Sequence, residues 1–268
     1  MDLYNSMEFT DAIGQRHAAD PHARIVSLVP SITELLCDLG LAPQLVGRTG
    51  FCIHPADVVR EIAKIGGTKD VNLDKIRKLT PTHVVVNIDE NEKPTVDRLA
   101  EFVPNIVVTH PARPEDNVSL AKLMGGIFCA TAKADAWCAA FEAELAVLRA
   151  MPKAPPQRVL YCIWQDPWMT VSQDTYIAAM LAELGWTVPA LGDARYPRFD
   201  WAPELLAQVD LVLLSSEPYR FTEAHVDALE RQIGKPVALL DGEMMSWYGS
   251  RALHGVRYLA TLRGLAGQ

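Results

Sequence analysis

The chain of 268 residues lacks the features that would direct it out of the cell or into a membrane. Its first 23 residues have no basic start and no apolar run, and a secretory signal peptide needs both. No stretch approaches the ~20 apolar residues of a membrane-spanning helix. Acidic residues occupy the leader instead, at Asp2, Glu8, Asp11 and Asp20. The sequence therefore predicts a cytoplasmic protein, or a periplasmic one if a signal peptide has been removed.

Basic residues and paired cysteines are also scarce. The 25 basic and 33 acidic side chains give a net charge of -8, which argues against a nucleic-acid partner because phosphates need a basic face. The five cysteines are odd in number, and four of them lie in apolar stretches, at positions 37, 129, 138 and 162. This pattern predicts buried free thiols rather than a disulfide framework.

Motifs for catalysis and metal binding are absent. Gly66-Gly67-Thr68-Lys69 lacks the spacing of a phosphate-binding loop, and no nucleophile elbow or catalytic triad is present. Cys52 and His54 are only two potential metal ligands, whereas a protein metal site takes three or four. We therefore predict no catalytic residue, no required cofactor and no metal site. His54 can still serve as one axial ligand to a metal already held in a macrocycle.

Apolar runs with strand character recur along the chain and alternate with helical segments. The predicted strands are residues 24–29, 45–47, 83–87, 105–109, 158–164, 211–215 and 236–241. Helices are predicted at 72–79, 92–102, 175–184, 203–208 and 250–263, and one more begins at Pro30-Ser31. For that helix Ser31 and Glu34 fit a capping box, and Gly40 fits its end. The alternation predicts an α/β fold with parallel sheets covered on both faces.

The two halves are joined by an Ala-rich helical stretch at 115–150. Gly125-Gly126 is predicted to end or loosen a first helix, and Thr131 to cap a second that runs to about Met151. The Pro-rich segment 152–156 then stops it. The predicted organisation is an N-terminal extension at 1–23, a first lobe at 24–112, a helical linker at 113–155 and a second lobe at 156–268, with 24–268 forming one binding domain.

Aromatic residues gather in the loops that follow the predicted strands. Ligands of parallel α/β sheets bind beyond the carboxyl ends of the strands, so these loops are the candidate site. A broad aromatic cleft suits a large, flat, partly apolar ligand, although the rings can instead pack within their own loops. Glu217 and Glu243 can bind a polar edge of the ligand, or pair with Arg251, Arg220 or Lys69. The aromatic candidates are Phe51, Trp164, Trp168, Tyr196, Tyr219, Trp247 and Tyr248.

Three segments carry a resemblance to a known family: residues 24–35, residues 65–76 and residues 79–86. Over residues 24–265 the chain resembles the helical-backbone periplasmic binding proteins, which include the cobalamin-binding protein and the iron-siderophore and haem receptors of ABC importers. The resemblance implies two α/β lobes joined by one long helix, with a ligand cleft between the lobes.

The resemblance also implies roles for individual residues. Phe51, Trp168 and the pair Trp247-Tyr248 fall where the family places cleft aromatics. Asp74 falls where the family has a carboxylate that docks to arginines of the membrane permease, although an acid in the first turn of a helix also favours the macrodipole. The corresponding glutamate of the second lobe, expected near residues 247–251, is missing.

The function expected from this resemblance is non-catalytic binding of cobalamin, haem or an iron complex by a monomer. The protein would deliver this small-molecule metal complex to an ABC transporter permease, or act as a cytoplasmic carrier or sensor. The alternative is an enzyme of chelatase-like architecture, with His54 as its base or metal ligand.

Overall fold

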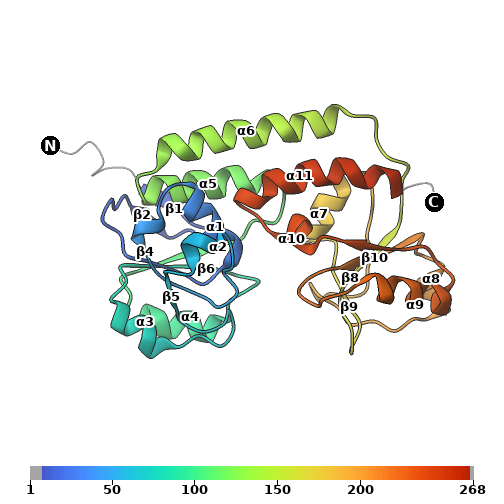
Figure 1. The fold of residues 1–268 in the computed structure, drawn as a ribbon, viewed down its shortest axis with the longest axis horizontal. Helices are drawn as coiled ribbons and strands as arrows, with labels where there is room; N and C mark the ends of the chain where they lie inside the picture. Colours follow the sequence, from blue (N-terminus) through green and yellow to red (C-terminus); the bar gives the residue numbers. More distant parts are fainter. Residues whose placement is uncertain (1–7, 266–268) are drawn as a thin grey trace. The chain divides into compact units, whose positions relative to one another are not determined.

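Two separate β-sheets with parallel cores organise the chain (Figure 1). The computed structural model describes residues 8–265, so the ends of the predicted extension and of the predicted second lobe lie outside the described residues. Contacts divide the chain into two units. The first comprises Met1–Pro111, Glu115–Phe141 and Tyr248–Ser250, and the second comprises Ala112–Pro114, Glu142–Trp247 and Arg251–Gln268. The predicted α/β class with two lobes is confirmed.

The first unit is built on a five-stranded parallel sheet with the order β5-β4-β3-β6-β7. β-Branched side chains dominate β6 (His83–Asn87), which lies between β3 and β7, and all five of its residues are buried. The other strands are β3 (Ile25–Ser27), β4 (Leu45–Arg48), β5 (Ala63–Lys64) and β7 (Asn105–Thr109). The helices are α1 (Pro30–Asp38), α2 (Ala56–Val59), α3 (Leu73–Leu79), α4 (Lys93–Ala100) and α5 (Asp116–Ile127), with a 3-10 turn, η1, at Ala42–Gln44.

One face of this sheet is covered by α3 and α4, which lie together in Figure 1. Ile76 of α3 and Leu99 of α4 are fully buried against Val84 and Val86 of β6. The side chain of Asn72 caps α3 by accepting a hydrogen bond from the backbone N–H of Lys75 at 2.9 Å. The apolar pattern of these helices therefore fixes the side of the sheet on which they pack.

A short hairpin of β1 (Glu8–Thr10) and β2 (Arg16–Ala18) covers the edge strand β7. Asp11 Oδ2 accepts the backbone N–H of Val108 at 3.0 Å, and the N–H of Ala12 donates to the carbonyl of Val108 at 2.9 Å. The described part of the predicted extension at 1–23 forms this hairpin, which is bonded to the first sheet at Val108.

The second unit has a four-stranded sheet with the order β11-β10-β8-β9. The strands β8 (Val159–Trp164), β10 (Leu211–Ser215) and β11 (Val237–Leu240) are parallel, and the edge strand β9 (Met169–Thr170) is antiparallel. The helices are α7 (Tyr176–Glu183), α8 (Pro203–Leu206), α9 (Glu223–Ile233), α10 (Gly242–Ser246) and α11 (Ser250–Leu262), followed by a 3-10 turn, η2, at Arg263–Leu265. The strands and helices predicted for this half are present, and β9, α9, α10 and η2 are additional.

The helix α6 (Thr131–Ala150) is continuous over 20 residues and begins in one unit and ends in the other. Its start and its end before Pro152 agree with the prediction. Helix α5 and the first part of α6 group with the first unit by their contacts. Gly125 and Gly126 lie in the last turn of α5, which ends at Ile127, one residue beyond the predicted end. A side chain at Gly126 would meet the ring of Phe9 at 2.1 Å, so glycine here serves close packing.

The capping box predicted at Ser31 is absent. Helix α1 begins at Pro30 with Val29 as its N-cap, and no side chain caps it. Proline at the first position removes one N–H that would otherwise need a partner, so a capping side chain is less needed. Gly40, at a φ of 78°, lies two residues beyond the last residue of α1, as predicted. Within residues 8–265 no helix combines the length and apolar character needed to cross a bilayer.

Candidate ligand-binding site

In the first unit, large apolar side chains remain exposed in the loops that follow β4 and β6. Phe51 is 63% exposed, Ile53 50% and Ile88 48%. All three lie beyond the carboxyl ends of parallel strands, the edge at which α/β sheets bind ligands. His54, in the same loop as Phe51, is half-buried.

A buried polar network holds the loop of Phe51 in place. The hydroxyl of Thr33 donates to Cys52 Sγ at 3.1 Å, and Thr49 Oγ1 lies 3.2 Å from the same sulfur. Burial raises the pKa of the Cys52 thiol, which therefore stays protonated. Cys52 is thus a structural residue. All five cysteines are free thiols, as the sequence predicts, but Cys37 and Cys129 are half-buried rather than buried.

The loop after β6 is organised by two asparagines. Asn91 Oδ1 accepts the backbone N–H of Asn87 at 2.8 Å, and Asn91 Nδ2 donates to the carbonyl of Thr68 at 3.1 Å. Asn87 Oδ1 in turn accepts the N–H of Asp89 at 2.8 Å. These bonds join the loop that presents Ile88 to the turn at residues 66–70.

Tyr248 belongs to the first unit and is buried, contrary to the expectation of an open cleft ring. Its hydroxyl donates to Glu90 Oε1. Burial first, and then the negative charge of Glu90, raise the pKa of the phenol well above its ordinary value. The backbone N–H of the next residue, Gly249, donates to Asn117 Oδ1 at 2.6 Å. Asn117 has no exposed surface. The segment Tyr248–Ser250 is therefore anchored to the first unit at two points.

In the second unit the exposed aromatic side chain is Trp164, at 40%. It is the last residue of β8, and its ring meets Tyr219 edge-on at a centroid distance of 5.5 Å. The backbone N–H of Tyr219 donates to the carbonyl of Ile163 at 3.3 Å, which places the loop after β10 beside the end of β8. The structure thus brings Trp164 and Tyr219 together at the ends of neighbouring strands.

Trp168 is placed differently. Its ring stacks on Phe221 at 5.8 Å and meets Trp201 edge-on at 5.1 Å, with Phe199 at 6.2 Å. These rings pack against the core of the second sheet. Trp168 is therefore half-buried in an aromatic cluster within the second unit. This matches the alternative that loop rings pack within their own lobe. The three partner rings carry no sequence signal that marks them as a cluster.

A second group of site candidates gathers where β10 and β11 end. Glu217 Oε1 accepts hydrogen bonds from Trp247 Nε1 at 2.6 Å and from the hydroxyl of Ser246 at 2.9 Å. Arg251 pairs with Glu243 at 2.8 Å, and its guanidinium lies 5.1 Å from the ring centroid of Trp247. Trp247 itself is buried. The sequence left two roles open for the glutamates, binding a polar edge of the ligand or pairing with a basic side chain. Glu243 forms an ion pair with Arg251.

Tyr196 and Asp74 lie apart from these groups. Tyr196 is half-buried in a segment that runs beside β9, where the N–H of Thr170 donates to the carbonyl of Pro197 at 3.0 Å. Asp74 is exposed in the first turn of α3. The role of Tyr196 in ligand binding and that of Asp74 in docking to a permease therefore stay predictions. Among residues 8–265 no group of three or more His, Cys, Asp or Glu side chains is arranged to hold a metal ion.

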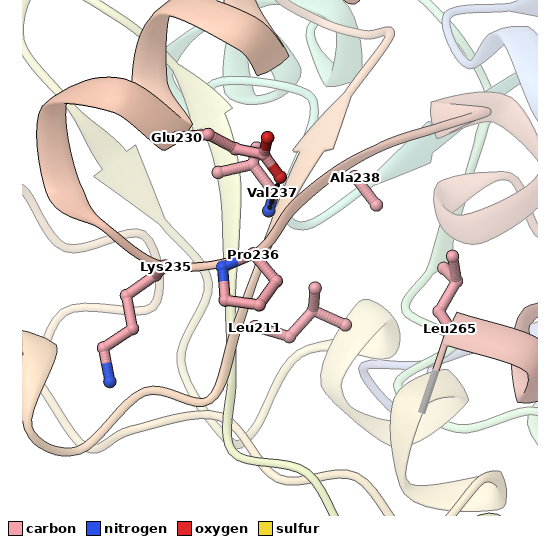
Figure 2. Close-up of a pocket in the computed structure, with 7 residues that line it drawn as sticks. All are labelled: Leu211, Glu230, Lys235, Pro236, Val237, Ala238 and Leu265. Atoms are coloured by element: carbon pink, nitrogen blue, oxygen red, sulfur yellow. Dashed lines mark hydrogen bonds between the residues drawn. The ribbon is translucent and has the colours of Figure 1, made fainter. Parts of the chain in front are cut away.

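A hollow of about 340 Å³ lies at the opposite end of the second sheet, as Figure 2 shows. It is lined by the first residues of two strands, Leu211 and Val237, and by Glu230, whose Oε1 accepts the N–H of Val237 at 3.0 Å. Parallel sheets bind ligands at their carboxyl ends, so we assign this hollow no part in the candidate site.

Comparison with known proteins places this arrangement in a recognised class. Two lobes with parallel sheets, and one helix shared between them, define a two-lobed binding fold. The family model described as periplasmic binding protein matches residues 25–203, well over half of the chain, and the chain belongs to that family.

Individual relatives are distant in sequence but close in structure. The vitamin B12-binding protein of Pectobacterium carotovorum subsp. carotovorum (strain PC1) is 20% identical over 86% of this chain and 84% of its own length. The periplasmic vitamin B12 binding protein BtuF of Vibrio cholerae superposes with a TM-score of 0.77 at 19% identity, covering 92% of this chain and 99% of its own. The periplasmic heme-binding protein RhuT from Roseiflexus sp. RS-1 gives 0.76 at 22%, covering 92% and 99%. At these identities the likeness establishes the fold.

Proposed function

We propose that this chain binds a large, flat metal complex of the cobalamin, haem or iron-complex type without converting it. The observation that carries the proposal is the exposure of Phe51, Ile53, Ile88 and Trp164 at the carboxyl ends of the two sheets. Exposed apolar side chains gathered at a ligand-binding edge favour an apolar ligand surface. The names of the relatives supply the ligand class.

Titration of the protein with cyanocobalamin and with haemin, followed by tryptophan fluorescence, tests this proposal. Phe51→Ala and Trp164→Ala should each weaken binding by about 1–3 kcal/mol, as the loss of a central aromatic anchor does. Val147→Ala removes an equally exposed apolar side chain from α6 and should leave the affinity unchanged. Unchanged affinity in both aromatic variants would contradict the proposed site.

The absence of chemical conversion is part of the proposal and separates it from the chelatase-like alternative. Ligand recovered after prolonged incubation should have its original absorbance spectrum and mass. His54→Ala should leave the affinity unchanged, or shift the visible spectrum of the complex if His54 is an axial ligand. A metal-insertion rate that disappears in His54→Ala would establish the enzyme instead.

We further propose that the protein is a monomer of 29.6 kDa that passes its ligand to an ABC transporter permease through Asp74. Light scattering after gel filtration measures the mass. Asp74→Arg should reduce ligand delivery to a permease while leaving ligand affinity intact, and Asp70→Arg, also exposed, is the matched control. The family name indicates two candidate locations to distinguish, the periplasm and the cytoplasm, of which the name itself favours the periplasm. Cell fractionation with N-terminal sequencing decides between the two locations.

A further inference from the structure

The carboxylate of Glu217 uses its two oxygen atoms unequally. Oε1 accepts both protein hydrogen bonds, from Ser246 at 2.9 Å and from Trp247 Nε1 at 2.6 Å. Oε2 has no hydrogen-bond partner within residues 8–265, and it is not among the polar atoms that are sealed from solvent there. One oxygen of a half-buried carboxylate is therefore left to accept a bond from outside the protein.

The backbone around Glu217 is tightly fixed. Its own carbonyl accepts a hydrogen bond from Ser215 Oγ at 2.5 Å. A side chain at Gly242 would come within 2.6 Å of Glu217 Cγ, and the N–H of Gly242 donates to Ser216 Oγ at 2.9 Å. Glycine is thus required at 242 so that α10 can approach the glutamate. The unsatisfied oxygen is held in place rather than carried on a mobile side chain.

Within the part of the chain that the structure describes, no positively charged side chain forms an ion pair with this carboxylate. The guanidinium of Arg251 is paired with Glu243 and lies over the ring of Trp247. Burial, and then the charge of Glu243, raise the pKa of Glu217 above its ordinary value. An oxygen in this setting gains most from an N–H or O–H donor, and an approaching carboxylate would meet negative charge without a compensating donor.

We propose that Glu217 Oε2 accepts a hydrogen bond from the edge of the ligand and so selects ligands bordered by uncharged amides over ligands bordered by carboxylates. The inference rests on the proposed function. Glu217 lies two residues before Tyr219, whose ring contacts the exposed Trp164. An apolar ring contact and a hydrogen-bond acceptor therefore arise from the same loop. Such a loop suits a flat macrocycle that carries primary amides at its rim.

Glu217→Gln tests this proposal because it replaces one hydrogen-bond acceptor atom with a donor. The amide oxygen can still accept from Ser246 and Trp247, while the amide nitrogen takes the place of Oε2 and turns an acceptor into a donor. The probes are dicyanocobinamide and dicyanocobyrinic acid, corrins that carry amides and carboxylic acids at corresponding positions. Affinities are measured at pH 8 by fluorescence and by absorbance.

The wild type should bind the amide corrin more tightly, and Glu217→Gln should lower the ratio of the two affinities by about 10-fold or more, the value of one charged hydrogen bond. Glu230→Gln is the matched control. This variant loses one negative charge from the same unit but keeps the oxygen that accepts the N–H of Val237. The ratio of its affinities for the two corrins should therefore equal that of the wild type.

The possible outcomes separate this inference from the proposed function. If neither corrin binds the wild type, the proposed function fails and the inference falls with it. If both bind but the ratio is the same in Glu217→Gln, ligand binding stands and the role of Glu217 is refuted. Thermal melting establishes that the variant is folded. Should it not fold, the wild-type ratio decides, because equal affinity for the two corrins overturns the inference.

Discussion

His83 begins strand β6 and is almost fully buried, with its ring edge-on to Phe128 at 5.3 Å. Burial lowers the pKa of its imidazole to about 4, with a smaller contribution from His17 that is opposed by Asp20. In the unfolded chain a histidine titrates near 6.5. Between these two values the unfolded chain binds the additional proton, so acid favours unfolding.

We therefore expect the wild type to lose stability as the pH falls from 6.5 towards 4 because of His83. His83→Gln should lose less stability over the same interval, even if it is less stable at neutral pH. The measurement is the melting temperature at pH 7.5, 6, 5 and 4. His22→Gln, which removes an exposed imidazole, should follow the wild-type profile. Parallel profiles for His83→Gln and the wild type would contradict this assignment.

The sequence identified individual site residues less well than it identified the loops that carry them. The loop positions of Phe51, Trp164 and Trp247 were predictable because a strand precedes each region. Their exposure was not predictable, because it depends on partners that are remote in sequence. Trp168 is covered by Phe199, Trp201 and Phe221, and Tyr248 by contacts with Glu90. Tertiary packing, which sequence periodicity does not encode, decides which ring is exposed.

Among the elements, α3 depends on one capping side chain. Asn72→Ala removes the acceptor for the N–H of Lys75 and should destabilise the protein by about 1 kcal/mol, whereas Asn72→Asp keeps an oxygen in place and should retain most of the stability. Chemical denaturation with urea measures both variants. Equal loss in the alanine and aspartate variants would show that the hydrogen bond contributes nothing.

A larger loss of stability is expected when the hydrogen bond that anchors Tyr248–Ser250 to α5 is removed. Asn117→Ala leaves the buried N–H of Gly249 without its acceptor, and such an unsatisfied group costs about 1–3 kcal/mol. Ser119→Ala, on the exposed side of the same helix, should change stability by less than about 0.5 kcal/mol. Urea denaturation of both variants is again the measurement. A neutral Asn117→Ala would mean that the segment is held by other contacts.

The elements that the sequence revealed are those with long, regular patterns. The valine runs of β6 and the alanine-rich α6 with its following prolines were predicted with nearly correct ends. The hairpin of β1 and β2 was missed because strands of three residues are too short to show an alternation. The double glycine was predicted correctly as lying at the end of α5, but the reason for glycine at 126 was not predictable, because the ring of Phe9 that packs there lies more than 100 positions earlier.

At the scale of the whole molecule, α6 is one uninterrupted helix of 20 residues, roughly 30 Å long, that both units share. A helix bends far less readily than a pair of extended strands, so we expect the radius of gyration to change little when a ligand binds. Small-angle X-ray scattering with and without cyanocobalamin measures it. A large decrease on binding would contradict the expectation.

A variant with a softened helix provides the comparison for this experiment. Ala139→Gly and Ala140→Gly change two exposed positions near the middle of α6. Each substitution destabilises the helix by about 1 kcal/mol. We expect this double variant to show the larger change in radius of gyration. If it behaves as the wild type does, α6 is not what limits the motion.

The return of Tyr248–Ser250 to the first unit also bears on how such a gene can be recombined. A chimaera joined within α6 would take Glu90 and Asn117 from one parent and Tyr248 and Gly249 from the other. The crossover that respects the fold is therefore discontinuous: three codons near the 3′ end must travel with the 5′ half. Every single-point crossover between Asn117 and Tyr248 would separate both pairs, and fragments split at the proline-rich segment would regain them only by reassembling.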